Sequence, residues 1–149
     1  MRRPRLQIVL SVCTLLACLA GVDATLTAVA AESPLLADAK VLRRGKILWL
    51  QCTACHDLAS PSPGMKDDAT IGKIGPTLHG VIGRSAATVE GYRYSDALRN
   101  AGLTWDKPTL DRWIKEPAAV VPGTLMAFIG VPDEADRRAL IAYLESATR

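Results

Sequence analysis

The sequence predicts a small all-α domain. Apolar residues recur with the 3.6-residue period of a helix near residues 37–52 and again near residues 133–147. Nowhere does the chain sustain the alternation of apolar and polar residues that a half-buried strand requires. Residues 32–149 are enough for one compact domain and leave no room for a second.

Residues 1–31 are expected to be a secretory signal peptide. A basic start over Met1–Arg5 precedes an apolar run over Leu6–Val22, and Ala28-Val29-Ala30 has the small side chains of a cleavage site. We therefore expect an exported, periplasmic protein. Two alternatives stay open: a retained membrane anchor, since the apolar run is close to the shortest that spans a bilayer, and a lipoprotein whose lipidated residue is Cys18.

The charge of the mature chain excludes one class of partner. Removal of the leader lowers the formal net charge from +3 to +1, because three arginines and one aspartate leave with it. So small a charge does not support nucleic-acid binding. The leader also holds two of the four cysteines, so the mature chain keeps only Cys52 and Cys55.

The two longer predicted helices stand near the ends of the mature domain. The first follows an irregular arm over residues 32–36, and its apolar face consists of Val41, Gly45, Leu48, Trp49 and Cys52. Glycine inside a helix costs about 1 kcal/mol relative to alanine, so we expect Gly45 to permit a close helix crossing; a glycine without a packing role is the alternative. The last helix begins with acidic residues, as the helix dipole favours. Its apolar face is expected to contain Leu140, Ile141, Tyr143, Leu144 and Ala147.

Loops and short helices are expected between them. Residues 57–74 are expected to form a loop, and residues 75–84 to continue as turn-rich chain. Met65 in this loop is expected to face solvent, and a role as an iron ligand is the alternative. A short helix around residues 95–101 ends at Gly102, and another runs over residues 106–115 behind the N-cap Asp106. Residues 117–132, rich in proline and glycine, are expected to be an extended loop.

Cys52-Thr53-Ala54-Cys55-His56 is the Cys-x-x-Cys-His run used for covalent attachment of c-type haem. Two thiols three positions apart on one helical turn can each add to a haem vinyl group, and His56 can then bind the iron. A structural zinc site needs about four ligands, whereas the mature chain offers only His79 besides this run. A thioredoxin-like pair stands at the head of a helix after a strand, whereas this pair closes a helix. We therefore expect one haem c, with both thiols consumed as thioethers.

The chain resembles the class I c-type cytochromes, in particular the mitochondrial branch with its soluble bacterial relatives. The resemblance covers nearly all of residues 40–148, with the motifs in family order. Besides the cysteine run, these motifs are Gly75-Pro76-Thr77-Leu78-His79-Gly80, Gly91-Tyr92-Arg93-Tyr94, Gly102-Leu103-Thr104-Trp105, Pro122–Phe128 and Leu140-Ile141-Ala142-Tyr143-Leu144. It implies a small cytochrome c fold, with crossing N- and C-terminal helices around a covalently attached haem and a chain that folds poorly without it.

The same resemblance implies the iron ligands. Met126 is the second axial ligand, on the face opposite His56, and Thr124 in the same loop belongs to the haem-binding set. His79 matches a position that does not bind iron. A methionine that only fills the core is the alternative for Met126.

Further haem contacts follow from the resemblance. The carbonyl of Pro76 accepts the ring proton of His56, and Tyr94, Trp105 and Arg84 donate to the haem propionates. The alternatives are a core aromatic role for Trp105 and a surface role for Arg84.

The chain departs from the mitochondrial pattern in the loop over residues 57–74, which is longer, and at two pocket positions. Leu98 replaces an asparagine, and Trp113 replaces a tyrosine near the methionine. Both replacements remove hydrogen-bonding groups on the Met126 side.

The rim of the haem edge also departs. Mitochondrial members carry lysines where this chain has Gln51, Ala118, Ala119 and Leu125. Lysine rings raise association rates and make them dependent on salt. We therefore expect docking through an apolar patch made of Ala118, Ala119, Val120, Val121 and Phe128.

The expected function is that of a monomeric one-electron carrier rather than an enzyme, because two axial ligands leave no open iron site. The redox partners implied are a dehydrogenase or quinol-oxidising complex on one side and an oxidase, another cytochrome or a reaction centre on the other. A haem peroxidase or gas-binding protein is the alternative if the sixth position is vacant. A dedicated haem subunit of a periplasmic dehydrogenase is another.

Overall fold

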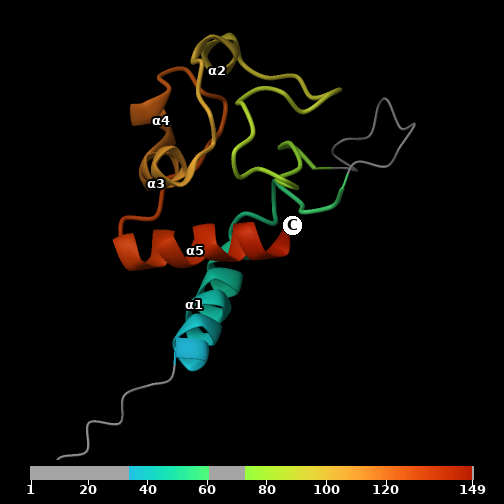
Figure 1. Ribbon diagram of the computed structural model, residues 1–149. Coiled ribbons are helices and arrows are strands. Elements are labelled where there is room, and N and C mark those ends of the chain that lie inside the picture. The colour runs from blue at the N-terminus through green and yellow to red at the C-terminus, as the bar shows by residue number, and fades with distance from the viewer. Residues whose placement is uncertain (1–33, 61–72, 149) are drawn as a thin grey trace, which may run out of the picture. The chain divides into compact units, whose positions relative to one another are not determined.

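A computed structural model of the protein describes residues 34–60 and 73–148, all within the unit Glu32–Arg149. The helices in these residues are α1 (Pro34–Trp49), α2 (Asp96–Asn100), α3 (Lys107–Lys115), α4 (Pro117–Val120) and α5 (Glu134–Ala147) (Figure 1). The described residues contain no strand, only an isolated antiparallel bridge between Ser85 and Thr104. The all-α prediction is confirmed. The predicted signal peptide and Met65 lie outside the described residues.

Helix α1 begins and ends earlier than predicted. It starts at Pro34, inside the expected irregular arm, because proline suits the first turn of a helix. It stops at Trp49, and the haem-attachment run follows as a series of turns rather than as regular helix. The N–H of Cys52 donates to the Trp49 carbonyl at 2.8 Å, and the N–H of His56 donates to the Cys52 carbonyl at 2.9 Å. The run therefore keeps one helical turn around the two cysteines.

Side-chain caps start the later helices where the sequence predicts them. The side chains of Ser95, Asp106 and Asp133 accept hydrogen bonds from backbone N–H groups at the heads of α2, α3 and α5. Gly102 follows α2 with a φ of +61°, as expected of a C-terminal glycine. The extended loop predicted over residues 117–132 is wrong at its start, since Pro117–Val120 form the short helix α4.

The crossing of α1 with α5 is confirmed. A Cβ atom placed on Gly45 would lie 2.1 Å from the carbonyl oxygen of Ala139 and 2.6 Å from Cβ of Tyr143, so no side chain fits there. Beside the crossing, Nε and Nη2 of Arg44 donate to the Asp136 carboxylate at 2.7 and 2.5 Å. The two terminal helices are thus joined by close packing and by a two-pronged ion pair.

The apolar faces differ from the predicted ones in detail. Trp49 and Leu140 lie in the core, but Val41 on α1 and Ala147 on α5 are exposed. The buried positions of α5 include Ala139 and a charged residue, Arg137. No helix among residues 34–60 and 73–148 is long and apolar enough to cross a membrane.

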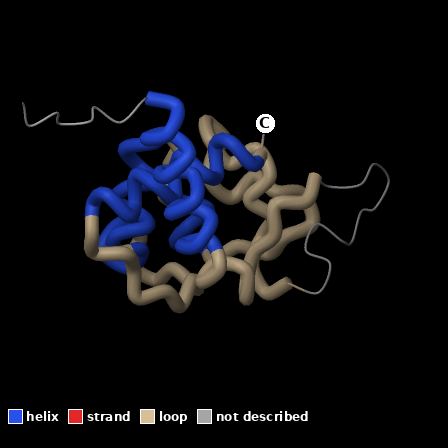
Figure 2. The backbone as a smooth tube through the Cα atoms, turned by 90° about the horizontal axis from the view of Figure 1, so that it is seen from below, coloured by secondary structure: helices blue, strands red, loops and turns tan. Residues whose placement is uncertain are grey.

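Loops connect these helices over much of the domain, as Figure 2 shows in tan. Residues 73–95 contain no helix, and their chain is held by local turns and by bonds to its neighbours. Backbone hydrogen bonds join Gly83, Arg84 and Ala86 to Leu103 and Trp105. This irregular segment supplies the chain around His56.

Candidate functional site

His56 is held by the chain that follows the first loop. Its ring is 9% exposed, and Nδ1 lies 2.7 Å from the carbonyl oxygen of Pro76. A carbonyl can only accept, so Nδ1 carries the proton and Nε2 is left with a lone pair. Burial lowers the pKa of His56, while the hydrogen bond to Pro76 opposes the shift. A neutral, oriented imidazole is the form that binds a metal.

Gly75 makes this arrangement sterically feasible. Its N–H donates to the Cys55 carbonyl at 2.7 Å. A Cβ atom at this position would lie 2.6 Å from Cε1 and 2.8 Å from Nδ1 of His56. This role of Gly75 was not predicted, although its place directly before Pro76 was a signal for close backbone approach.

Cys52 and Cys55 are free, partly buried thiols in the turns before His56. Burial, with a smaller contribution from Cys55, raises the pKa of the Cys52 thiol to about 11. The ammonium group of Lys73 donates to the Thr53 carbonyl and so braces the same turns. The two sulfur atoms and the His56 ring therefore come from one short, internally bonded segment.

Met126 lies in a loop that we call the methionine loop, residues 121–133. Its side chain is partly buried and packs against the hydrophobic core, as does that of Cys52. The Thr124 hydroxyl accepts from the Met126 N–H at 3.3 Å, and the Thr124 N–H donates to the Val121 carbonyl at 3.1 Å. The fold thus brings Cys52 and Met126, which are far apart in the sequence, to one core.

Arg84 is a half-buried cation. Its guanidinium donates to the carbonyls of His79 at 2.6 Å and Thr77 at 3.0 Å, and burial lowers its pKa. In the described part of the chain no carboxylate pairs with it. The Tyr94 hydroxyl accepts from the Val89 N–H at 3.3 Å. Tyr94 and Arg84 also interact electrostatically with each other. This corner suits an anionic group such as a propionate.

The aromatic residues expected near the haem lie together. Trp105 is buried, and its ring centroid is 5.1 Å from that of Trp113, with the planes tilted by 55°. Leu98, the other pocket replacement, is partly buried against the same core. The predicted replacements therefore add apolar packing, Trp113 next to Trp105 and Leu98 against the core.

The predicted docking patch needs three corrections. Val120 and Phe128 are only partly exposed and pack against the hydrophobic core. Val121 is only 4% exposed and belongs to the core, because its N–H donates to the Pro117 carbonyl and turns the side chain inward. The most exposed large apolar residues of the methionine loop are Leu125, at 79%, and Ile129, at 95%. Ala118 and Ala119 on α4 are exposed as predicted.

Sequence reasoning also missed Arg137 and Asp111. The Arg137 side chain is buried, and Nε donates to Oδ1 of Asp111 at 2.8 Å across α3 and α5. A signal was present, because Arg137 stands three residues before Leu140 and seven before Leu144, on the apolar face of the last helix.

Comparisons with known proteins agree with this geometry. The chain is 46% identical over 100 residues to the cytochrome c2 of Rhodoblastus acidophilus, covering 67% of this chain and 86% of the relative. It is 40% identical over 117 residues to the cytochrome c2 of Blastochloris viridis, covering 78% and 86%. The solved structure of cytochrome cH from Methylobacterium extorquens matches with a TM-score of 0.60 and 37% identity, over 70% of this chain and 97% of that one. No family model matches.

The fold and the cysteine-histidine site define a c-type cytochrome, and the relatives give the branch: the chain belongs to the class I c-type cytochromes. Members of this family are electron-transfer proteins rather than enzymes, and they carry covalently attached haem. The predicted family, fold and general role as an electron carrier are confirmed.

Proposed function

We propose that the protein is a one-electron carrier whose haem is attached through Cys52 and Cys55 and whose iron is bound by His56 and Met126. The observation that carries this proposal is the buried His56 ring, which is fixed by Pro76 so that Nε2 remains for a metal. When bound, the haem supplies an iron centre that cycles between ferrous and ferric states. A soft thioether ligand favours the ferrous state and so raises the reduction potential.

The residues fit such a group. Two thiols and an imidazole stand in one braced turn, and Met126 reaches the same core from a distant loop. Arg84 offers a positive charge that no described carboxylate balances. We assign Arg84, Tyr94 and Trp105 to the propionates, and Thr124 to the support of the methionine loop.

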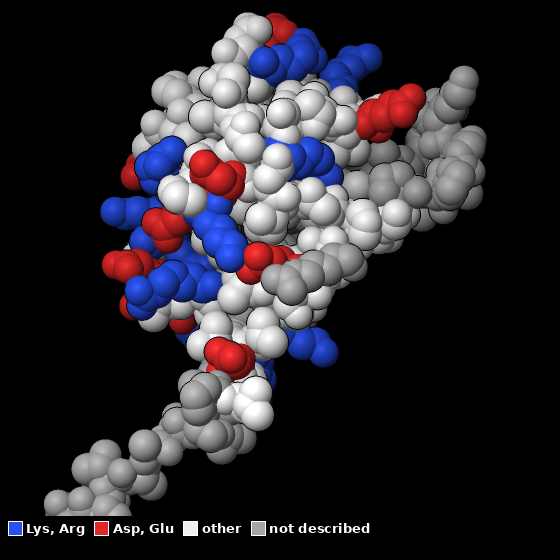
Figure 3. Space-filling model, viewed as in Figure 1, with Lys and Arg blue, Asp and Glu red and all other residues white. Residues whose placement is uncertain are grey.

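Docking to redox partners is proposed through an exposed apolar patch, defined here as Ala118, Ala119, Leu125 and Ile129. Between Glu116 and Asp133 the chain carries no charged side chain. Figure 3 shows lysines and arginines intermixed with acidic residues in one region of the surface. The exposed ion pairs include Arg44 with Asp136 and Arg138 with Glu134. Electron-transfer encounters are small and brief, so a few apolar contacts suffice.

The proposed partners are the electron donors and acceptors of an exported carrier. The donor is a dehydrogenase or quinol-oxidising complex, and the acceptor is an oxidase, another cytochrome or a reaction centre. We propose that residues 1–31 are a signal peptide and that the mature domain works in the periplasm as a monomer. Mass spectrometry of the purified holoprotein tests this, since cleavage leaves a new N-terminus near Ala31 and a retained or lipidated leader does not.

The ligand assignment is tested by the spectrum of the oxidised holoprotein. We expect the weak far-red charge-transfer band of a sulfur-to-iron bond, its loss in Met126→Ala, and its survival in Met65→Ala. Met65→Ala is a matched control because it removes the other methionine of the mature chain. If the wild-type protein lacks the band and its ferrous form binds carbon monoxide readily, the sixth position is open and the gas-binding or peroxidase alternative replaces this proposal.

A further inference from the structure

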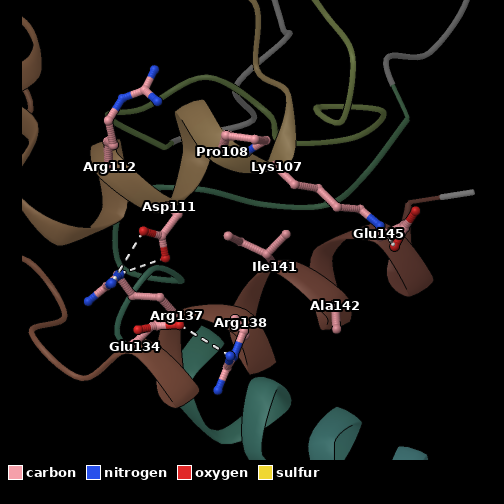
Figure 4. A pocket seen from close by; sticks show the side chains of 10 residues that line it. All are labelled: Lys107, Pro108, Asp111, Arg112, Glu134, Arg137, Arg138, Ile141, Ala142 and Glu145. Atoms are coloured by element: carbon pink, nitrogen blue, oxygen red, sulfur yellow. Dashed lines mark hydrogen bonds and ion pairs between the residues drawn. The ribbon is translucent and has the colours of Figure 1, made fainter.

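The guanidinium of Arg137 ties α5 to α3 and to the end of the methionine loop. Its side chain is 6% exposed. Nε and Nη2 donate to the two Asp111 oxygens at 2.8 and 3.2 Å, and Figure 4 shows this pair beside the cavity between α3 and α5. Nη1 donates to the carbonyls of Val131 at 3.1 Å and Pro132 at 2.7 Å. One buried fork therefore holds two helices and the loop together.

Two further contacts fix the same end of the loop. The N–H of Val131 donates to the Ile114 carbonyl at 2.9 Å, and the Val131 side chain is buried. Gly130 has a φ of +102°, and a Cβ atom there would lie 2.0 Å from the Lys115 carbonyl oxygen. The backbone of the loop thus runs directly against the end of α3.

The middle of the loop is held less firmly. Among the described residues, the backbone bonds of its central part are those of Met126 with Thr124 and Phe128. Leu125 and Ile129 on either side are exposed. The position of Met126 therefore depends on the two anchored ends, and Arg137 with Asp111 forms the buried ionic part of one of them.

We propose that Arg137 and Asp111 are positioning residues for the thioether of Met126, and that their ion pair sets how readily an outside ligand displaces it. This inference rests on the proposed function, in which Met126 binds the iron. For Met126 to move away, the segment around it must swing outward about its anchors. While Asp111 holds the guanidinium, the carbonyls of Val131 and Pro132 stay fixed, and that motion is opposed.

The cavity in Figure 4 is lined by charged residues whose ion pairs have a structural role. It measures about 640 Å³ and is lined by Lys107, Asp111, Glu134, Arg137 and Ile141 among others. Six of its charged residues are joined in pairs, Lys107 with Glu145 and Arg138 with Glu134 as well as Arg137 with Asp111. The Arg137 pair differs from its neighbours because it alone of these three also holds loop carbonyls.

The test is displacement of the sixth ligand by imidazole in the ferric holoprotein of Asp111→Asn. We expect roughly tenfold tighter imidazole binding than in the wild type, equivalent to about 1.4 kcal/mol. The matched control is Asp136→Asn, which breaks the other carboxylate–arginine fork of α5 without touching the loop. Both variants are expected to unfold more easily, but only Asp111→Asn should change imidazole affinity.

The outcomes separate the inference from the proposed function. Equal imidazole affinity in Asp111→Asn, Asp136→Asn and the wild type, with the band intact, overturns the positioning role alone. An absent band in the wild type overturns the Met126 assignment and this inference with it. If Asp111→Asn does not fold, Arg137→Lys gives the same test, because lysine keeps the charge but lacks the fork.

Discussion

Nδ1 of His56 lies 2.7 Å from the carbonyl oxygen of Pro76, and the backbone of Gly75 lies directly against the same ring. Together the two residues fix the tautomer and the direction of the imidazole. Since the acceptor is a carbonyl of the main chain, it cannot be removed by changing a side chain. The packing beside it can be changed.

Gly75→Ala is expected to push the His56 ring away from its acceptor. The added Cβ would stand 2.6 Å from Cε1, and overpacking of this kind costs about 2 kcal/mol. Urea unfolding of the holoprotein and its reduction potential measure the result. Gly80→Ala is the control: it introduces backbone strain at a φ of +59° with nothing nearby, so it should lower stability without moving the potential. An unchanged potential in Gly75→Ala would contradict the orienting role.

Gly45→Ala is expected to separate α1 from α5. In an exposed helix this change would stabilise by about 1 kcal/mol. Here the Cβ would meet the Ala139 carbonyl at 2.1 Å, and we expect a net loss of about 3 kcal/mol in the free energy of unfolding. Lys46→Ala, at the exposed next position, should leave stability nearly unchanged. Equal unfolding midpoints for the two variants would show that the crossing tolerates a side chain.

Asp106 gives a pH dependence with a defined sign. Hydrogen bonds from the side chain and the backbone N–H of Thr109 lower its pKa below the ordinary value of 3.8. A carboxyl group with a lowered folded-state pKa stabilises the fold above its unfolded pKa and loses that contribution as the pH falls through the folded value. Asp106→Asn keeps an N-cap but cannot titrate. Its stability should therefore fall less than that of the wild type between pH 5 and pH 2, as followed by thermal unfolding. Parallel curves would contradict the assignment.

Because the proposed docking patch is apolar, we expect the rate of electron transfer to depend on the shape of the patch rather than on charge. Leu125→Ser with Ile129→Ser should slow electron self-exchange between ferrous and ferric copies roughly tenfold, corresponding to about 1.4 kcal/mol of encounter free energy. Self-exchange is measured by NMR and needs no knowledge of the natural partner. Leu35→Ser with Ile47→Ser is the control, since both residues are exposed on α1. A rate that changed steeply with added salt would instead indicate that charge controls the encounter.

Local signals in the sequence predicted the fold well. Asp106 and Asp133 mark helix starts because a cap acts over three residues, and the cysteine run is read from spacing alone. The packing role of Gly45 could be inferred because a glycine inside a helix destabilises the helix, and close packing must offset that loss of stability. The family resemblance then connected these pieces in the right order.

Short irregular segments and contacts between distant segments were not predictable in the same way. Val121 was placed on the surface, although its backbone bond to Pro117 turns it into the core. The α4 helix was missed because four residues are too few to show a period. The partnership of Arg137 with Asp111 joins positions 26 apart, and only the packing of α5 on α3 brings them together.

The crossing of α1 with α5 also sets the order in which the chain can bind its haem and close its core. Arg44 and Asp136 are 92 positions apart, so the core cannot close until the final helix has been delivered. In the closed domain, burial raises the pKa of the Cys52 thiol to about 11. A buried, protonated thiol is a poor nucleophile. We therefore expect haem attachment to precede closure, so that the cofactor is enclosed by a chain that folds around it.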